Sequence, residues 1–339
     1  MMGKALPRLL RLSTVLLLLA GNVASVLAQP LASRPELELF VREMVEKHGF
    51  DRDALLDVFR QARIERRILE IMNRPVKRKT WNQYRPMFVN QDRIRGGIRF
   101  WRENEEVLSR ARRIYGVPPE IITAVIGVES HYGQNTGRYR VLDALATLAF
   151  DYPPRGDAFR VELEDYLLLA REEGFAPPSL KGSFAGAMGI AQFMPGSYRR
   201  YGVDFDGDGR RDLLGNVADA IGSVAHYLSA NGWRPDQPVA VPAHVLSDLG
   251  ESRASAGLDS WQALSEWKAA GISPREEISE DGRAILIDLR TDEGLEHWLG
   301  FDSFHALTRY NPSKYYAMAV YQLGREIHSG WQAESAGEP

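Results

Sequence analysis

Helical hydrophobic periodicity recurs through most of this chain of 339 residues, and it constrains the fold more than any other feature. Apolar side chains repeat every three to four residues, and several of these segments begin near a proline or end at a glycine. A series of this kind predicts a mainly α protein whose helices share a core. The predicted helical segments are 35–50, 51–63, 92–116, one opened by Pro118 and Pro119, 141–150, 157–174, 218–232 and 312–330.

The stretch 237–300 has a different pattern. "PVAVPAHVL" and "RAILIDLRT" have the composition of strands, and the short helical piece "WQALSEWKAAG" lies between them. We therefore predict a small α+β insertion at 237–300. It divides a larger unit into 34–236 and 301–332, and the last residues, 333–339, are predicted to be a disordered tail.

The first 28 residues have the composition of an export signal. Lys4, Arg8 and Arg11 precede an apolar run, and small or apolar residues lead up to a predicted cut after Ala28. The chain has no cysteine, which excludes disulfides, thiol catalysis and a lipid anchor on an N-terminal cysteine. We expect a periplasmic protein without integral membrane association after cleavage. Its net charge of −3 does not favour a nucleic-acid partner.

Glu129 is an ionisable residue at a position where the pattern predicts burial. Ile122, Val125 and Ile126 precede it by seven, four and three residues, so all four fall on one helical face. Burial disfavours a charged carboxylate and raises its pKa, and a carboxylic acid that stays protonated near neutral pH can donate a proton. The alternative is a structural glutamate that pairs with an arginine or reaches solvent.

"DFDGDGRRD" (204–212) has the spacing of a calcium-binding loop. Asp204, Asp206 and Asp208 occupy the first, third and fifth positions, a glycine follows at the sixth, and Arg210 would offer its carbonyl. Three closely spaced carboxylates repel one another unless a cation lies between them, which favours a metal site over a polar turn. The twelfth position is Gly215 instead of the usual glutamate.

The ordered series "ESHYG" (129–133), "GAMGIAQFMP" (186–195) and the aspartate-rich loop resembles the membrane-bound lytic transglycosylase B family. The likeness runs from about Tyr84 to the last helix. It implies a lysozyme-like core, flanked by an N-terminal helical region, and an enzyme that cleaves the MurNAc–GlcNAc bond of peptidoglycan to give 1,6-anhydromuramoyl ends. It also implies that Glu129 is the single acid and base and that calcium is structural, with Asp219 as the carboxylate from the following helix.

The resemblance extends to substrate contacts. It implies that glycan strands lie on a set of aromatic, amide, hydroxyl and basic side chains, for which tyrosine offers both an apolar face and a hydroxyl. We expected the small residues of "GAMGIAQFMP" to let a sugar chain approach the backbone. The implied substrate-binding residues are Tyr84, Arg155, Ser183, Gln192, Tyr227, Tyr310, Asn311 and Tyr316.

Two other functions stay open on the sequence. A hydrolytic muramidase would need a second carboxylate, for which Asp151 and Asp157 are available in the neighbouring segment. A non-catalytic, calcium-stabilised glycan-binding scaffold is the second alternative. Proteins of cell-wall synthesis or remodelling are open as partners under all three interpretations.

Overall fold

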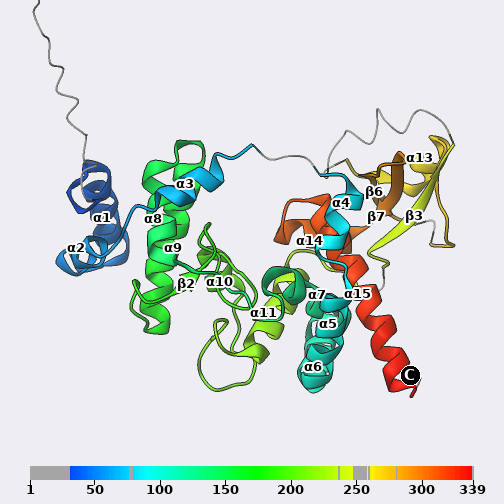
Figure 1. Ribbon diagram of the computed structural model, residues 1–339, viewed down its shortest axis with the longest axis horizontal. Helices are drawn as coiled ribbons and strands as arrows, with labels where there is room; N and C mark the ends of the chain where they lie inside the picture. The colour runs from blue at the N-terminus through cyan, green and yellow to red at the C-terminus, as the bar shows by residue number, and fades with distance from the viewer. Residues whose placement is uncertain are drawn as a thin grey trace, which may run out of the picture.

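The computed structural model describes residues 31–75, 79–235, 237–246, 258, 260–279 and 281–337. Two lobes lie side by side across the long axis of the molecule, and the C-terminal helix runs out from the second lobe (Figure 1). The predicted export signal and its cleavage site lie outside the described residues. Within the described part of the chain, no helix is long and apolar enough to cross a membrane.

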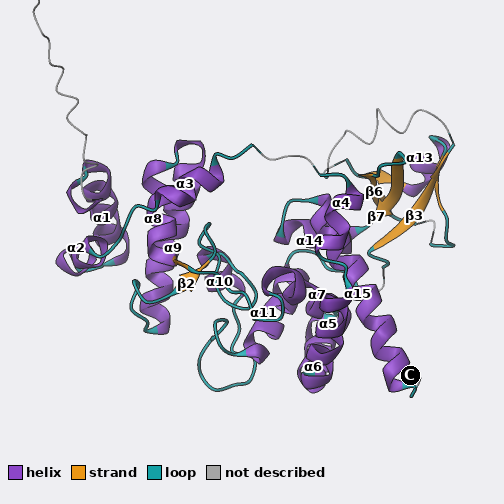
Figure 2. Ribbon diagram, in the orientation of Figure 1, coloured by secondary structure: helices purple, strands orange, loops and turns teal. Residues whose placement is uncertain are grey.

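Helices dominate the fold, as predicted, and a small sheet lies at one end (Figure 2). The helices are α1 (Pro35–His48), α2 (Arg52–Arg60), α3 (Arg66–Met72), α4 (Trp81–Tyr84), α5 (Gln91–Glu103), α6 (Glu105–Tyr115), α7 (Pro119–Ser130), α8 (Val141–Asp151), α9 (Gly156–Glu173), α10 (Pro195–Tyr201), α11 (Val217–Ala230), α13 (Leu264–Ala269), α14 (Asp302–Tyr310) and α15 (Lys314–Ser335). The strands are β1 (Tyr139–Arg140), β2 (Lys181–Gly182), β3 (Ala240–Val245), β4 (Gln262–Ala263), β5 (Ile272–Pro274), β6 (Arg283–Arg290) and β7 (Leu295–Gly300).

The first lobe consists of α1–α3, α8 and α9. Buried polar side chains of α8 join its elements, since Asp143 Oδ1 accepts from the Arg63 amide at 2.9 Å and Thr147 Oγ1 accepts from the Glu65 amide at 2.9 Å. These contacts satisfy two backbone amides of the link between α2 and α3, which would otherwise be left without partners near the core. The connection into α3 is therefore held against α8.

The second lobe contains α4–α7, α14, α15 and the sheet, while α10 and α11 lie between the lobes (Figure 1). The five-stranded sheet has the order β4-β6-β7-β3-β5 and is antiparallel throughout. Successive residues of β6 point to opposite faces. Ile285, Ile287 and Leu289 join the main helical core, whereas Ala284 and Leu286 join a second core under α13. The predicted 237–300 insertion is thus buried against the helical core through one face.

Two sequence predictions differ from the structure. The predicted single helix over 92–116 is divided into α5 and α6 at Asn104, whose backbone leaves the helical region (φ −125°, ψ 24°) while its side-chain amide donates to the Phe100 carbonyl at 2.8 Å. An asparagine side chain competes for backbone groups in this way and ends helices. At the other end of the chain, α15 continues to Ser335, three residues into the predicted tail.

Candidate active site

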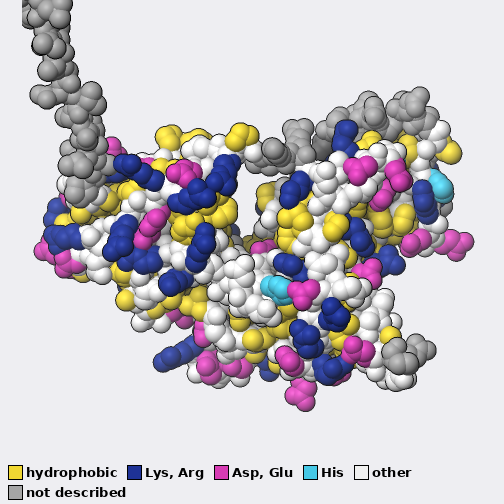
Figure 3. Space-filling view, in the orientation of Figure 1, with side chains coloured by type: hydrophobic (Ala, Val, Ile, Leu, Met, Phe, Trp, Pro, Cys, Tyr) yellow, Lys and Arg dark blue, Asp and Glu magenta, His cyan; other side chains and the backbone are white. Residues whose placement is uncertain are grey.

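The surface of the molecule is hollowed between the two lobes (Figure 3). Helix α7, which carries Glu129 in its last turn, lies in the second lobe next to the segments that connect the lobes (Figure 1). Pro119 starts α7 at a position where proline costs no hydrogen bond, and the left-handed backbone of His131 (φ 53°) ends the helix. The helix therefore ends one residue after the carboxylate.

Two hydrogen bonds and one glycine fix this helix end. The Ser130 hydroxyl is buried and donates to the Ile190 carbonyl at 2.6 Å, which joins α7 to the glycine-rich segment 183–194. The Tyr132 hydroxyl donates to the Arg93 carbonyl of α5 at 2.6 Å. A Cβ at Gly127 would lie 2.6 Å from that hydroxyl, so only glycine leaves room for the Tyr132 side chain. Because Ser130 and Tyr132 are both anchored on either side of His131, the position of Glu129 is well defined.

Glu129 has one direct side-chain partner among the described residues: the Tyr316 hydroxyl donates to Oε1 at 2.6 Å. Burial raises the pKa of Glu129 to about 7, even though the Tyr316 hydrogen bond acts in the opposite direction. The desolvation cost of the carboxylate therefore outweighs the stabilisation by one donor. A side chain with this pKa exists in both protonation states near neutral pH, as general acid–base catalysis requires.

Three of the predicted substrate-binding tyrosines lie near this carboxyl. The pKa values of Tyr84, Tyr310 and Tyr316 are all raised, first by burial and then by the negative charge of Glu129. Tyr310 and Tyr316 are stacked, with ring centroids 6.4 Å apart and an interplanar angle of 14°. The fold thus brings together residues from α4, α7, α14 and α15.

The hydroxyls of two of the predicted tyrosines are occupied by protein. The Tyr310 hydroxyl donates to the Ala191 carbonyl at 2.5 Å, and the Tyr227 hydroxyl donates to the Arg309 carbonyl at 2.6 Å. Their rings pack together, with centroids 4.8 Å apart, beside Phe193. Tyr227 is buried. These two side chains hold the Glu129 region in place through the glycine-rich segment.

Ser183 and Gln192 belong to the glycine-rich segment and bond mainly within it. Ser183 Oγ accepts from the Ala187 amide at 3.0 Å, and Gln192 Nε2 donates to the Thr136 carbonyl at 3.0 Å and the Gly189 carbonyl at 2.9 Å. Gln192 has a left-handed backbone (φ 49°). In this arrangement the Gln192 Oε1 atom receives no hydrogen bond from the described residues and is available as an acceptor.

The expectation that the glycines open the backbone to a sugar is wrong. A Cβ at Gly186 would lie 2.5 Å from the Leu145 side chain, and a Cβ at Gly189 would lie 2.2 Å from the Leu213 carbonyl oxygen. Both glycines also have positive φ values, 89° and 72°. The missing side chains therefore admit protein atoms, and the turn they allow is tightly packed.

Two predicted substrate residues lie at exposed positions. Arg155 ends a short 3-10 segment between α8 and α9, and its guanidinium packs over the Phe159 ring at 5.1 Å from the centroid. Asn311 is exposed in the link between α14 and α15. Among the described residues, no hydrogen bond or ion pair joins either side chain to Glu129 or to its tyrosine neighbours.

The two aspartates considered as a second catalytic carboxylate have other positions. Asp151 forms an ion pair with Arg34 (Nη1 to Oδ1, 2.5 Å), which joins the end of α8 to the start of α1. Asp157 is exposed in the first turn of α9. The structure gives Asp151 a role within the first lobe, and Glu129 is the glutamate whose pKa burial raises to near neutrality in this site.

The aspartate-rich loop places three of its predicted ligands together. Oxygen atoms of Asp204, Asp206 and Asp219 all lie within 4.8 Å of one another. Calcium takes six to eight oxygen ligands, and a group of carboxylates at this spacing fits that requirement. Asp208 is not part of the group: its Oδ1 accepts from the Arg210 amide at 2.8 Å.

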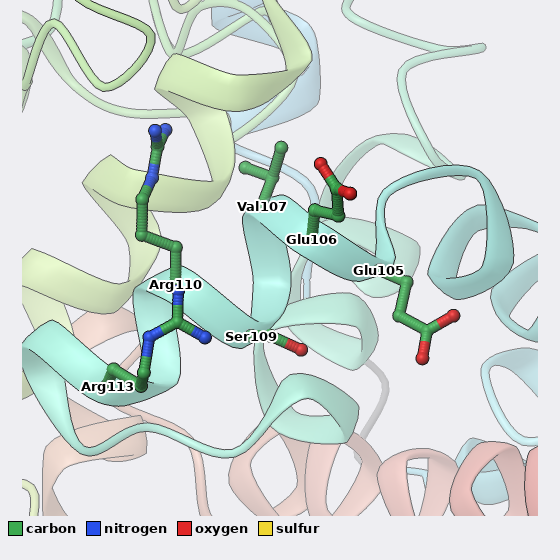
Figure 4. A pocket seen from close by; sticks show the side chains of 6 residues that line it. All are labelled: Glu105, Glu106, Val107, Ser109, Arg110 and Arg113. Carbon is green, nitrogen blue, oxygen red and sulfur yellow. The ribbon is translucent and has the colours of Figure 1, made fainter.

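The loop is connected to α11 and to α6. Asp219 is fully buried and accepts from the Phe205 and Asp212 amides at 2.6 and 2.7 Å, and burial raises its pKa. The Arg110 side chain of α6 lies over the Phe205 ring, 4.2 Å from its centroid, and donates to the Phe205 carbonyl. Figure 4 shows Arg110 in the hollow along α6 with Arg113 nearby. A cation held by Asp204, Asp206 and Asp219 would stabilise the connection of α10 to α11.

Sequence reasoning missed residues that the structure places in the two sites. Tyr315 lies beside Tyr84, with ring centroids 5.5 Å apart, and the repeated tyrosine of "PSKYYAM" was a visible signal for it. Asn216 caps α11 and donates to Asp206 Oδ2 at 2.6 Å, which lowers the pKa of Asp206. An asparagine just before a helical pattern is a capping signal.

The comparison with known proteins follows this geometry. Residues 32–325 match the Transglycosylase SLT domain family. The chain belongs to this family. It is 43% identical over 306 residues to membrane-bound lytic murein transglycosylase B of Escherichia coli (strain K12), covering 87% of this chain and 83% of that protein. The soluble lytic transglycosylase SltB1 of Pseudomonas aeruginosa is 46% identical and superposes with a TM-score of 0.83 over 89% of this chain and 100% of that one.

Two further solved relatives contain ligands. Lytic transglycosylase Slt35 of Escherichia coli, in complex with calcium, is 43% identical, with a TM-score of 0.81 over 88% of this chain and 94% of that one. SltB3 of Pseudomonas aeruginosa, in complex with NAG-NAM-pentapeptide, is 28% identical, with a TM-score of 0.78 over 87% and 80%. These likenesses confirm the predicted fold class and family.

Proposed function

We propose that Glu129 is the single acid and base with which this lytic murein transglycosylase cleaves the MurNAc–GlcNAc β-1,4 bond of peptidoglycan. The observation that carries the proposal is the burial of Glu129, which raises its pKa to about 7 while Tyr316 holds its Oε1 at 2.6 Å. A carboxyl with this pKa can give a proton and then take one back within a single turnover.

In the first step, protonated Glu129 donates to the glycosidic oxygen, and the C1–O bond breaks. The muramoyl N-acetyl group stabilises the positive charge that develops at C1, so the protein supplies no nucleophile. In the second step, the Glu129 carboxylate takes the proton of the O6 hydroxyl of the same sugar. O6 then bonds to C1 and closes a 1,6-anhydro ring, which returns Glu129 to its protonated form.

The Tyr316 hydroxyl supports the second step. It donates to Glu129 Oε1, so it stabilises the carboxylate that the first step produces. Tyr310, which stacks on Tyr316, and Tyr84 supply aromatic surface beside the carboxyl for sugar rings, and the free Gln192 Oε1 is an acceptor for a hydroxyl or amide. Arg155, Ser183, Tyr227 and Asn311 stay predicted contacts of a longer glycan strand.

We further infer that Asp204, Asp206 and Asp219 hold a structural calcium ion; Asp208, which lies outside this group in the structure, and the Arg210 carbonyl stay predicted ligands. The close approach of the first three carboxylates and the calcium complex of Slt35 support this inference. The ion would supply positive charge that lets these carboxylates lie together, and no catalytic step requires it. Export to the periplasm, directed by residues 1–28, would bring the enzyme to its substrate.

The decisive experiment is mass spectrometry of muropeptides that the mature protein releases from purified sacculi. We expect 1,6-anhydromuramic ends from the wild type and none from Glu129→Gln, which should still bind glycan. Glu162→Gln is the matched control, because burial also raises the pKa of Glu162, but its Oε2 accepts from the Gly196 amide of α10 and not from Tyr316.

Each alternative predicts a different result. Hydrated reducing ends would indicate a muramidase and would require a second carboxylate. Retained binding without release by the wild type would indicate a glycan-binding scaffold. Turnover by Glu129→Gln at the wild-type rate would remove Glu129 from the mechanism.

A further inference from the structure

A second groove is lined by Tyr84 and by residues of the inserted sheet. It has a volume of about 760 Å³ and lies between α4, the start of α15 and the end of β6. Its lining residues are Lys79, Thr80, Tyr84, Leu258, Asp288, Arg290, Pro312, Ser313, Lys314 and Tyr315. Tyr84 lines this groove, and both burial and the negative charge of Glu129 raise its pKa, so the groove lies near the Glu129 carboxyl.

The 237–300 insertion forms one wall of this groove through β6. The Arg290 amide donates to the Tyr315 hydroxyl at 3.2 Å, and the Tyr315 ring lies 5.5 Å from Tyr84. A direct series of contacts thus connects Arg290 to the tyrosine next to the catalytic acid. The inserted sheet therefore reaches the tyrosines beside Glu129, which its sequence did not reveal.

The charges of the groove favour an anionic ligand. Three of its residues are basic, and Asp288 is its one acidic residue. Asp288 is occupied, because the Lys314 ammonium lies 2.8 Å from its Oδ1. Arg290 is exposed at the end of β6 and forms no ion pair with the described residues, and the Lys79 ammonium contacts only the Met87 sulfur, a weak acceptor. Two cationic groups are therefore available to a ligand.

A neutral sugar does not require such charges. The hydroxyl and N-acetyl groups of a glycan bind well to amides and aromatic faces, as around Gln192 and Tyr310. A peptide that branches from the muramoyl lactyl group carries carboxylates, and arginine can bind a carboxylate through two parallel hydrogen bonds. Leu258 and Pro312 add apolar surface for small side chains of such a peptide.

We propose that this groove binds the carboxylate-bearing peptide branch of the murein strand, with Arg290 as its main charge partner and Lys79 as the second. The proposal rests on the function proposed above, since it places the peptide next to the bond that Glu129 cleaves. It assigns the inserted sheet to substrate selection: strands that carry peptides bind more tightly than stripped strands.

The test measures binding in the Glu129→Gln background, so that no ligand is consumed. The two ligands are a GlcNAc-MurNAc disaccharide with an intact peptide and the same disaccharide without it. We expect Arg290→Glu to weaken binding of the peptide-bearing ligand about fivefold more than that of the stripped ligand, the upper range for an exposed ion pair. Arg112→Glu, an exposed arginine of α6 outside this groove, should affect the two ligands equally.

An equal effect of Arg290→Glu on both ligands, or no effect on either, would overturn the proposal, provided that the thermal midpoint shows the variant to be folded. Lys79→Glu, measured with the same two ligands, gives a second test that does not depend on β6. Binding and turnover separate the two proposals. Selective loss of the peptide-bearing ligand, together with a wild type that releases no anhydromuropeptides, would retain the groove and refute the lytic mechanism. Release of anhydromuropeptides by the wild type, together with an equal effect of Arg290→Glu on both ligands, would refute the groove alone.

Discussion

Tyr316→Phe tests how the protein sets the pKa of Glu129, the proposed catalytic acid. The substitution removes one hydroxyl, whose donor contact with Glu129 Oε1 is 2.6 Å long, and leaves the ring in place. That hydrogen bond stabilises the carboxylate form, so its loss must raise the pKa of Glu129 from its value of about 7. The stacked Tyr310 ring keeps the packing intact.

The magnitude follows from the charge of the acceptor. A hydrogen bond to a charged group contributes about 1.5–3 kcal/mol, and one pKa unit corresponds to about 1.4 kcal/mol. The pKa of Glu129 should therefore rise by about one to two units in Tyr316→Phe. Because Glu129 must be protonated to begin the reaction, its pKa in the free enzyme sets the alkaline limb of kcat/KM against pH.

The assay is the release of anhydromuropeptides from sacculi between pH 5 and pH 10. The wild-type alkaline limb should lie near pH 7, and that of Tyr316→Phe about one to two units higher. Tyr310→Phe is the matched control: its hydroxyl bonds to the Ala191 carbonyl and not to Glu129, so its limb should stay at the wild-type position. An unshifted or lowered limb in Tyr316→Phe would refute the assignment of this hydrogen bond.

Two further predictions concern stability. The folded pKa of Glu129, about 7, exceeds the unfolded value of 4.5, so the wild type loses stability as pH rises through that range. In denaturant unfolding, the free energy of unfolding of Glu129→Gln should match that of the wild type at pH 4 and exceed it at pH 8 by up to about 3 kcal/mol. A constant difference across pH would contradict this. Calcium at about a hundredfold excess over its dissociation constant should stabilise the wild type by about 2.7 kcal/mol, seen as a raised thermal midpoint. Asp206→Asn should lose this increase, while Asp157→Asn, with an exposed aspartate on α9, should retain it; an equal increase in both variants would exclude the loop as the site.

Local patterns in the sequence predicted most of the helices and the strands β3 and β6, because each depends on the spacing of apolar residues within one segment. The division of α5 from α6 was missed, since it depends on one asparagine side chain that binds the backbone behind it. The burial of Glu129 was predictable for the same local reason. Its partner Tyr316 came only from family resemblance, because the two residues are 187 positions apart.

The sequence by itself determined the helical class, the burial of Glu129 and the acidic character of the aspartate-rich loop, which all depend on residues close together in the chain. Tertiary structure decided what surrounds them. It showed that Gly186 and Gly189 admit protein atoms, not a sugar, because the atoms in their missing Cβ positions belong to Leu145 and Leu213. It also brought Arg290 of the inserted sheet to Tyr315 and Tyr84, a meeting that depends on long-range packing of β6 against the helical core.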